Sequence, residues 1–243
     1  MKQYGLIGFP LEHSFSKKYF TEKFIAENIA DCSYENFELK KIEDFISLKN
    51  SNPNLSGLNV TIPYKQSIMQ YLDEIDETAL QVGAVNTIKF SDGKCIGYNT
   101  DVIGFEKTFA PLVKPHHSFA LIFGNGGATK SVEYVLRKLG IQYQIVSRNP
   151  SVNQLSYEDL NLFTMRQFHV LINCTPVGMF PKVNEVLNIP YDYINSKFLC
   201  YDLIYNPKET EFLKRSKSKM AVTRNGHQML IEQAEVAWEI WND

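Results

Sequence analysis

A glycine-rich turn between a predicted buried strand and a predicted helix constrains this chain more than any other feature. Residues 119–123 are five apolar residues, the sequence Gly124-Asn125-Gly126-Gly127-Ala128 follows directly, and residues 128–139 have the pattern of a helix. In such a unit the glycines permit a tight turn and close approach of the backbone to a phosphate, which the helix N-terminus attracts. Thr129 occupies the third glycine position of the usual motif. The segment is either a dinucleotide-binding turn or a tight turn without a ligand, and its context favours the first.

The end of the next predicted strand, residues 143–147, bears on the choice of cofactor. NAD-binding units carry an acidic residue about 20 positions after the turn, whereas an arginine there accommodates the 2′-phosphate of NADP. This strand ends in Ser147-Arg148-Asn149, and Glu133, the one acidic residue between Ala128 and Asn149, falls inside the predicted helix. The cofactor predicted from these residues is NADP; the alternative is a solvated arginine at a strand end.

The overall composition excludes several classes of protein. The chain has 243 residues, 44% of them hydrophobic, and a net charge of −2, which is typical of a soluble globular protein and argues against nucleic acid as a partner. No apolar run approaches the roughly 18 residues of a membrane span, and glycine, proline and glutamate interrupt any signal peptide. The four cysteines form no C-x-x-C pair and the five histidines show no ligand spacing, so we expect a cytoplasmic protein without a metal.

Alternating strand and helix patterns predict an α/β protein. The predicted strands cover residues 2–8, 34–39, 55–60, 119–123, 143–147, 170–173 and 198–203, and a hairpin joins 87–90 to 95–98. The predicted helices cover residues 16–29, 42–49, 77–81, 102–111, 128–139 and 226–241, with another starting at 64 and further helices between the later strands. We expect the first sheet to be mostly parallel with an antiparallel edge. Gln233 lies on the apolar stripe of the last helix, where it either bonds a backbone group or faces a polar ligand.

Polar clusters at element ends in the first half suggest a binding site. Ser14 and Ser16 come at the start of a predicted helix, where Ser16 is the expected N-cap and two hydroxyls could also hold a carboxylate. Asn59 and Thr61 share one side of a strand, and Lys65 follows within one turn. Further amides and hydroxyls, and Asp101, lie in the segments Gly83–Thr87 and Gly97–Asp101. Ligands of open α/β sheets bind at such strand ends.

Lys65 and Asp101 are one base and one acid among neutral groups suited to a polyol. Hydride reduction of a ketone generates an alkoxide, which needs a proton or a positive charge beside it. Lys65 can supply either, and Asp101 can orient the lysine or hold a substrate hydroxyl. The alternative for Lys65 is an ordinary surface lysine.

Nearly end to end, the chain resembles the shikimate dehydrogenase family. The matching stretches are His13–Ser16, Gly57–Lys65, Gly83–Thr87, Gly97–Gly104, Gly124–Ala128, Asn173–Met179, Asp202–Pro207 and Asn225–Gly226 with Met229, Leu230, Gln233 and Ala234. The resemblance implies reversible NADPH-dependent reduction of 3-dehydroshikimate to shikimate in aromatic amino-acid biosynthesis, by a monomer or homodimer. It also implies a substrate-binding catalytic domain of residues 1–101 plus 225–243 and a Rossmann NADP-binding domain of residues 102–224, with the last helix returning to the first domain.

The same resemblance implies individual roles. The catalytic pair would be Lys65 and Asp101. Ser14 and Ser16 would bind the carboxylate of the substrate. The hydroxyls of the substrate would bind Asn59, Thr61, Asn86, Asp101 and Gln233. Tyr205 would line the substrate pocket. The cofactor would contact Gly124, Asn125, Gly126, Gly127, Ala128, Ser147, Arg148, Asn149, Asn173, Cys174, Thr175, Gly226 and Met229.

This chain departs from the family pattern in three places. Lys17, Phe20 and Thr21 replace the usual proline, histidine and asparagine, which affects helix packing more than chemistry. Val152 replaces a second basic residue after Arg148, so the preference for NADP is expected to be modest. The segment between Asn149 and Asn173 is short, which predicts trimmed helices in the cofactor domain. Two rivals remain: a quinate or quinate/shikimate dehydrogenase using NAD, which Arg148 disfavours, and a ligand-sensing relative without activity, which the retained Lys65 and Asp101 disfavour.

Overall fold

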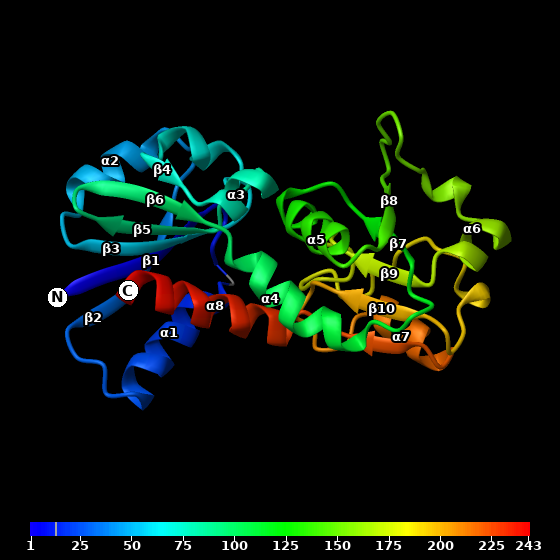
Figure 1. Ribbon diagram of the computed structural model, residues 1–243. Coiled ribbons are helices and arrows are strands. Elements are labelled where there is room, and N and C mark those ends of the chain that lie inside the picture. Colours follow the sequence, from blue (N-terminus) through cyan, green and yellow to red (C-terminus); the bar gives the residue numbers. More distant parts are fainter. Residues whose placement is uncertain (13) are drawn as a thin grey trace. The chain divides into compact units, whose positions relative to one another are not determined.

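The chain folds into two compact units, one of residues 1–100 with 234–243 and the other of residues 101–233 (Figure 1). The structure is a computed structural model that describes residues 1–12 and 14–243. His13, which begins one of the stretches that resemble the shikimate dehydrogenases, lies outside the described residues. The chain passes between the units at Thr100, the first residue of helix α4, and again within helix α8.

The first unit is built on a six-stranded sheet. Its strands, in spatial order, are β2 (Cys32–Glu38), β1 (Lys2–Gly8), β3 (Leu55–Val60), β5 (Thr87–Ser91), β6 (Lys94–Tyr98) and β4 (Glu74–Ile75). Strand β1 pairs in parallel with β2 and β3, β5 is antiparallel to both β3 and β6, and β4 is parallel to β6. The sheet is therefore mostly parallel, as predicted. The prediction of an antiparallel edge is wrong, because the short strand β4 pairs in parallel with β6. The β5–β6 hairpin therefore lies inside the sheet and not at its edge.

Local sequence explains the hairpin and the two covered faces. Asp92 and Gly93 both have positive φ, 51° and 77°, which a two-residue turn between antiparallel strands requires. Successive side chains of β1 point to opposite faces. One face packs on α1 (Phe15–Ala26) and the end of α8 (His227–Asn242), and the other packs on α2 (Asp44–Ser51), the 3₁₀ turn η1 (Ser67–Tyr71) and α3 (Glu77–Val82). Figure 1 shows α1 and α8 on one side of this sheet and α2 and α3 on the other.

The predicted helix from Tyr64 is wrong. The chain instead makes turns after Pro63 and then the short 3₁₀ segment η1. The carbonyl of Lys65, which would serve a continuing helix, accepts a hydrogen bond from the N–H of Val85 at 2.7 Å. A contact with a segment twenty residues away therefore replaces the helical bond.

The second unit has a five-stranded sheet in which all strands are parallel. Its order is β11 (Val222–Arg224), β10 (Leu199–Asp202), β9 (Val170–Asn173), β7 (Phe119–Phe123) and β8 (Gln142–Val146). The first strand in sequence, β7, lies between the second and the third, which is a doubly wound order that binds ligands at the carboxyl ends of its strands. The α/β fold with a Rossmann-type second part is thus confirmed.

Helices connect most of these strands. They are α4 (Thr100–Phe109), which runs into the 3₁₀ turn η2 (Ala110–Leu112), α5 (Gly127–Lys138), α6 (Leu162–Gln167) and α7 (Glu211–Ser218), with further 3₁₀ turns η3 (Tyr157–Asp159) and η4 (Tyr191–Tyr193). The helix expected between β9 and β10 is absent from the described chain, where η4 is the sole helical turn. Three prolines and Gly178, which has a φ of 90°, break that segment.

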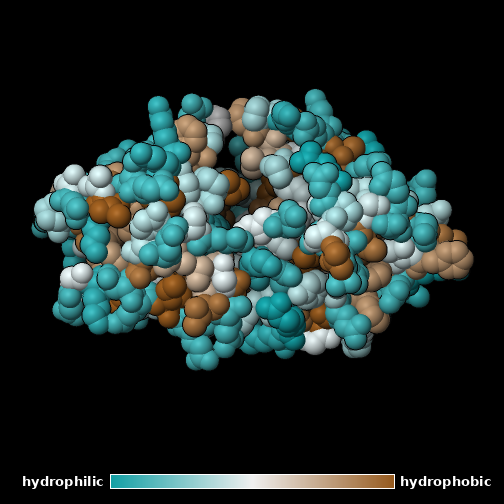
Figure 2. Space-filling model, turned by 90° about the horizontal axis from the view of Figure 1, so that it is seen from above, coloured by the Kyte–Doolittle hydropathy of each residue, from teal (hydrophilic) through white to brown (hydrophobic). Residues whose placement is uncertain are grey.

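The surface is that of a polar globular protein. On the face in Figure 2, hydrophilic residues predominate and hydrophobic residues form small separate groups. Over residues 1–12 and 14–243, no helix combines the length and hydrophobicity that a membrane span needs. In the same residues, no group of three or more His, Cys, Asp or Glu side chains is arranged to hold a metal ion.

Candidate functional site

A buried chain of polar side chains runs through the first unit. Asn59, on β3, accepts a hydrogen bond at its Oδ1 from the hydroxyl of Tyr34, on β2, at 2.7 Å. Burial raises the pKa of the Tyr34 hydroxyl, and the nearby Ser16 hydroxyl opposes this shift. The amide nitrogen of Asn59 donates to Thr87 Oγ1 at 3.3 Å. Tyr34, which the sequence did not single out, thus bonds to Asn59 and lies close to Ser16, and both of these are predicted substrate residues.

The same chain continues to the start of α4. Asn86 Oδ1 accepts from the backbone N–H of Thr100 at 2.7 Å, and Asn86 Nδ2 donates to Thr100 Oγ1 at 3.0 Å. Asn86 and Thr100 are 2% and 0% exposed, so these groups have little access to water. Asn99 donates to the carbonyl of Ala84 at 2.8 Å and fixes the neighbouring loop. The Asn86 side chain therefore fixes Thr100, the residue before Asp101, through both its oxygen and its nitrogen.

Backbone hydrogen bonds place Lys65 next to the segment that contains Asn86. The Lys65 carbonyl accepts from Val85, the residue before Asn86, and the Asn86 carbonyl accepts from Val60 N–H at 2.8 Å. Lys65 is half-buried. Asp101 is 7% exposed and lies in the first turn of α4, where a carboxylate also interacts favourably with the helix dipole. The main-chain positions at 65 and 100 are thus both tied to residues 85 and 86.

Ser14 holds a position expected of a ligand-binding hydroxyl. It occupies the N-cap of α1, so the prediction that Ser16 is the N-cap is wrong; Ser16 is the second residue of the helix. The side chain of Ser14 makes no capping bond, and within the described residues its buried Oγ has no hydrogen-bond partner. The first turn of α1 contains no acidic residue. An unpartnered hydroxyl at a helix N-terminus suits a carboxylate.

Two further predicted substrate residues have backbone roles. Thr61 follows β3, and its N–H donates to the Ile7 carbonyl at 2.9 Å. Gln233, 7% exposed on α8, donates its amide to the Leu230 carbonyl at 2.9 Å. Of the two alternatives for Gln233, the structure thus shows the backbone contact.

The glycine-rich turn has the geometry of a phosphate site. Gly124 has a φ of 98°, which disfavours other residues, and a Cβ there would lie 2.9 Å from the methyl group of Thr175. A Cβ at Gly126 would meet nothing within 4 Å, so the turn is open on that side. Helix α5 begins at Gly127 with neither a side-chain cap nor an acidic first turn. Exposed Asn125 and half-buried Ala128 flank these glycines, and the open, uncapped helix start fits a pyrophosphate.

Thr129, at the third glycine position, is accommodated by hydrogen bonds. Its hydroxyl donates to the Gly124 carbonyl at 2.9 Å and lies within hydrogen-bonding reach of the Cys174 thiol, whose pKa is raised by burial. The threonine therefore ties the turn to the loop after β9 and does not block it.

The end of β8 presents Ser147, Arg148 and Asn149. Ser147 is buried, and its Oγ accepts from the N–H of Asn149 at 3.3 Å, whereas Arg148 is exposed. Arg148 lies near Tyr157, which stacks on Phe123 of β7. A guanidinium at this strand end, with no carboxylate in its place, fits a 2′-phosphate.

The loops after β9 and β10 meet at a buried carboxylate that the sequence did not reveal as part of the site. Asp202, 0% exposed, accepts from Asn173 Nδ2 at 3.0 Å, Ile204 N–H at 3.0 Å and Thr210 Oγ1 at 2.6 Å. Burial raises the pKa of Asp202 to about 7, although these three bonds favour the charged form. The sequence held two signals: an acidic residue ends an otherwise apolar strand, and that residue begins the stretch Asp202–Pro207, which resembles the shikimate dehydrogenases.

The remaining predicted cofactor residues, Gly226 and Met229, lie at the start of α8. Gly226 donates its N–H to Ile204 at 3.0 Å, and a Cβ there would lie 2.1 Å from the Leu203 carbonyl, so only glycine fits. Met229 is buried, and its carbonyl would lie 2.6 Å from a Cβ at Gly104. Tyr205, a predicted substrate residue, is half-buried in the loop after β10.

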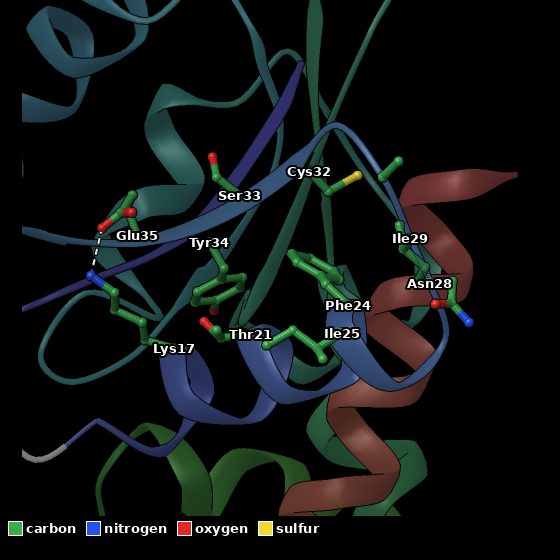
Figure 3. Close-up of a pocket in the computed structure, with 11 residues that line it drawn as sticks. Lys17, Thr21, Phe24, Ile25, Asn28, Ile29, Cys32, Ser33, Tyr34 and Glu35 are labelled. Atoms are coloured by element: carbon green, nitrogen blue, oxygen red, sulfur yellow. Dashed lines mark hydrogen bonds and ion pairs between the residues drawn. The ribbon is translucent and has the colours of Figure 1, made fainter.

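A separate groove of about 680 Å³ lies between α1 and β2 (Figure 3). Lys17 and Glu35 form an ion pair of 2.7 Å across one end, and Ile25, Cys32 and Tyr34 line other parts. Among the described residues, none of the predicted substrate or cofactor residues lines it. Tyr34 connects the groove to the predicted substrate residues, because it lines the groove and its hydroxyl donates to Asn59.

Comparison with known proteins gives consistent results. Residues 6–88 match the family described as shikimate dehydrogenase substrate binding domain. The shikimate dehydrogenase (NADP(+)) of Methanosphaera stadtmanae is 38% identical over 98% of this chain and 90% of that relative. A crystal structure of a shikimate dehydrogenase in complex with NADP⁺ is 35% identical with a TM-score of 0.87, covering 99% of this chain and 90% of that one. Quinate dehydrogenase from Corynebacterium glutamicum in complex with NAD is 26% identical with a TM-score of 0.87, covering 99% and 93%.

Proposed function

The chain belongs to the shikimate dehydrogenase family, and we propose that it catalyses the reversible NADPH-dependent reduction of 3-dehydroshikimate to shikimate. The observation that carries this proposal is the buried polar chain from Tyr34 to Thr100, which fixes neutral donors and acceptors for a polyol. Substrate binding is assigned to residues 1–101 plus 225–243, and NADP binding to residues 102–224. The enzyme would act in the cytoplasm as a monomer or homodimer, in the pathway to aromatic amino acids.

Substrate recognition follows from the chemistry of the groups present. The Ser14 hydroxyl, which has no partner among the described residues, and the start of α1 would hold the carboxylate together with Ser16. The substrate hydroxyls would bind the remaining polar side chains, which are Asn59, Thr61, Asn86, Asp101 and Gln233. Because most of these groups are neutral and prearranged, they can orient a polyol with little reorganisation. Tyr205 would border the substrate and the nicotinamide.

The cofactor is held by charge and by open backbone. The pyrophosphate would bind at the start of α5, where Gly126 leaves space, and the 2′-phosphate would bind Arg148 with Ser147 and Asn149. The loops bearing Asn173, Cys174 and Thr175, together with Gly226 and Met229, would border it. Bound NADPH supplies the hydride.

Lys65 and Asp101 would handle the charge that develops on the substrate oxygen. Hydride addition to the carbonyl leaves an alkoxide, and the Lys65 ammonium would donate a proton to it or balance its charge. Asp101 would orient the ammonium and accept a hydrogen bond from a substrate hydroxyl. In support of this, the main chain at residue 65 bonds to Val85 and the main chain at residue 100 bonds to Asn86, so residues 65 and 100 are both held by neighbouring residues of one loop.

A single assay tests the proposal against its rivals. Purified protein is mixed with shikimate or quinate, each with NADP⁺ or NAD⁺, and reduced nicotinamide is followed by absorbance. We expect the highest kcat/KM with shikimate and NADP⁺. Preference for quinate with NAD⁺ would instead favour an activity like that of the quinate dehydrogenase relative, and no turnover with any pair would favour a ligand-sensing protein.

A further inference from the structure

Asp202 joins three separate segments of the second unit. Its carboxylate receives hydrogen bonds from the end of β9, from the loop after β10 and from Thr210, the N-cap of α7. Within the described residues no lysine or arginine forms an ion pair with it. Burying a charge without a counter-ion costs free energy. The three hydrogen bonds offset part of that cost and fix the segments that donate them, which points to a positioning role for the carboxylate.

We call each of these three hydrogen bonds, with the contacts that continue from it, an arm. The first arm, through Asn173, leads to the glycine-rich turn. Asn173, held by Asp202, accepts at its Oδ1 from both the N–H and the hydroxyl of Thr175, at 3.0 and 2.7 Å. Thr175 in turn lies against Gly124, where a Cβ would come within 2.9 Å of its methyl group. A shift of Asn173 would therefore move the residue that packs on the turn.

The second arm leads to the loop after β10 and the start of α8. Asp202 holds the N–H of Ile204, and the Ile204 carbonyl accepts from Gly226 at 3.0 Å. Leu203 N–H also donates to the Asn173 carbonyl at 3.0 Å, which links the two arms. The third arm ends at Thr210, the last residue before α7, which caps that helix by accepting from Leu213 N–H at 3.4 Å.

We propose that Asp202 is a positioning residue for the nicotinamide cofactor, fixing the loops after β9 and β10 in the shape that NADPH requires. The proposal rests on the proposed function. It assigns the first two arms to cofactor binding and the third to the stability of α7. The Asn173 and Ile204 donors need an acceptor oxygen and not a negative charge, so asparagine at position 202 can largely replace the carboxylate.

Three variants separate the arms: Asp202→Ala removes all of them, Asp202→Asn keeps an oxygen toward Asn173 and Ile204, and Thr210→Val removes the third alone. NADPH binding without substrate is measured by fluorescence titration, and amide exchange is followed in the ligand-free proteins. For Asp202→Ala we expect a Kd at least tenfold higher and faster exchange at Thr175 and Ile204. For Asp202→Asn and Thr210→Val we expect a Kd within about threefold of the parent, although Thr210→Val unfolds more easily.

A folded Asp202→Ala protein with unchanged Kd and exchange would overturn the proposal, as would an equal rise in Kd for Thr210→Val. If Asp202→Ala does not fold, the parent protein decides: NADPH must slow exchange at Thr175 and Ile204 at least tenfold while leaving Leu213 unchanged. Equal protection at all three amides refutes the assignment. Failure of the proposed function is a distinct result, namely a parent chain that binds no NADPH, and the ordering of the two loops by Asp202 is still read from exchange without ligand.

Discussion

Replacing Tyr34 by phenylalanine tests whether the buried polar chain sets the substrate site. The substitution removes one oxygen from a side chain that is 3% exposed and leaves the ring stacked on Phe20. Asn59 Oδ1 then loses its 2.7 Å donor, and the Ser16 hydroxyl loses the phenol oxygen near it. An unsatisfied buried polar group costs about 1–3 kcal/mol. We expect Tyr34→Phe to lower the free energy of unfolding by that amount, or the melting temperature by about 2–4 °C for each kcal/mol.

The effect on binding follows from the orientation of Asn59. Its remaining bonds to Thr87 and the Asn86 carbonyl are long, 3.3 and 3.5 Å, so the amide is free to turn once Tyr34 no longer holds its oxygen. A loss of about 1.4 kcal/mol in substrate binding is a tenfold change. We therefore expect the KM for shikimate to rise about tenfold, with a smaller change in kcat, in steady-state assays at saturating NADP⁺.

Tyr4→Phe is the matched control, because Tyr4 lies in the same aromatic cluster and its buried hydroxyl has no hydrogen-bond partner within the described residues. Removing that hydroxyl should leave KM unchanged and stability equal or higher. The reasoning is refuted if Tyr34→Phe matches the parent protein in both KM and melting temperature, or if Tyr4→Phe loses as much stability as Tyr34→Phe.

Three other outcomes are expected. Lys65→Ala should lower kcat at least a hundredfold, as loss of an acid–base group does, with an unchanged melting temperature; normal turnover would remove Lys65 from the mechanism. Arg148→Asp should shift kcat/KM from NADP⁺ toward NAD⁺, and an unchanged cofactor ratio would count against its contact with the 2′-phosphate. Asp202 has a pKa raised to about 7 in the folded chain, above its ordinary value of about 4. The folded state therefore binds more protons between those values, and stability should fall as pH rises from about 4 to about 7, by at most about 4 kcal/mol. Denaturant midpoints measured against pH should show this slope in the parent and lose it in Asp202→Asn.

Much of the fold could be predicted because its signals are local. The strand over Leu55–Val60 and the strand and turn from Phe119 to Ala128 follow from apolar runs and glycines next to each other in the chain. The errors arise where distant segments compete with local preference. Lys65 gives its carbonyl to Val85, which ends the predicted helix, and the addition of β4 beyond β6 places the hairpin inside the sheet.

The candidate site divides in the same way. Residues predicted to touch ligands, such as Asn59 and Arg148, stand at strand ends, where polar residue types are visible against apolar neighbours. Tyr34 lies inside a strand and Asp202 is the last residue of another. Their hydrogen-bond partners Asn59 and Asn173 are 25 and 29 residues away in sequence. Periodicity reports which face a side chain occupies but not which group it meets there. Residues that orient a site are therefore identified from the structure, as buried polar groups whose hydrogen bonds join two elements. Substituting them should change the affinity for the ligand although no group that contacts the ligand is removed.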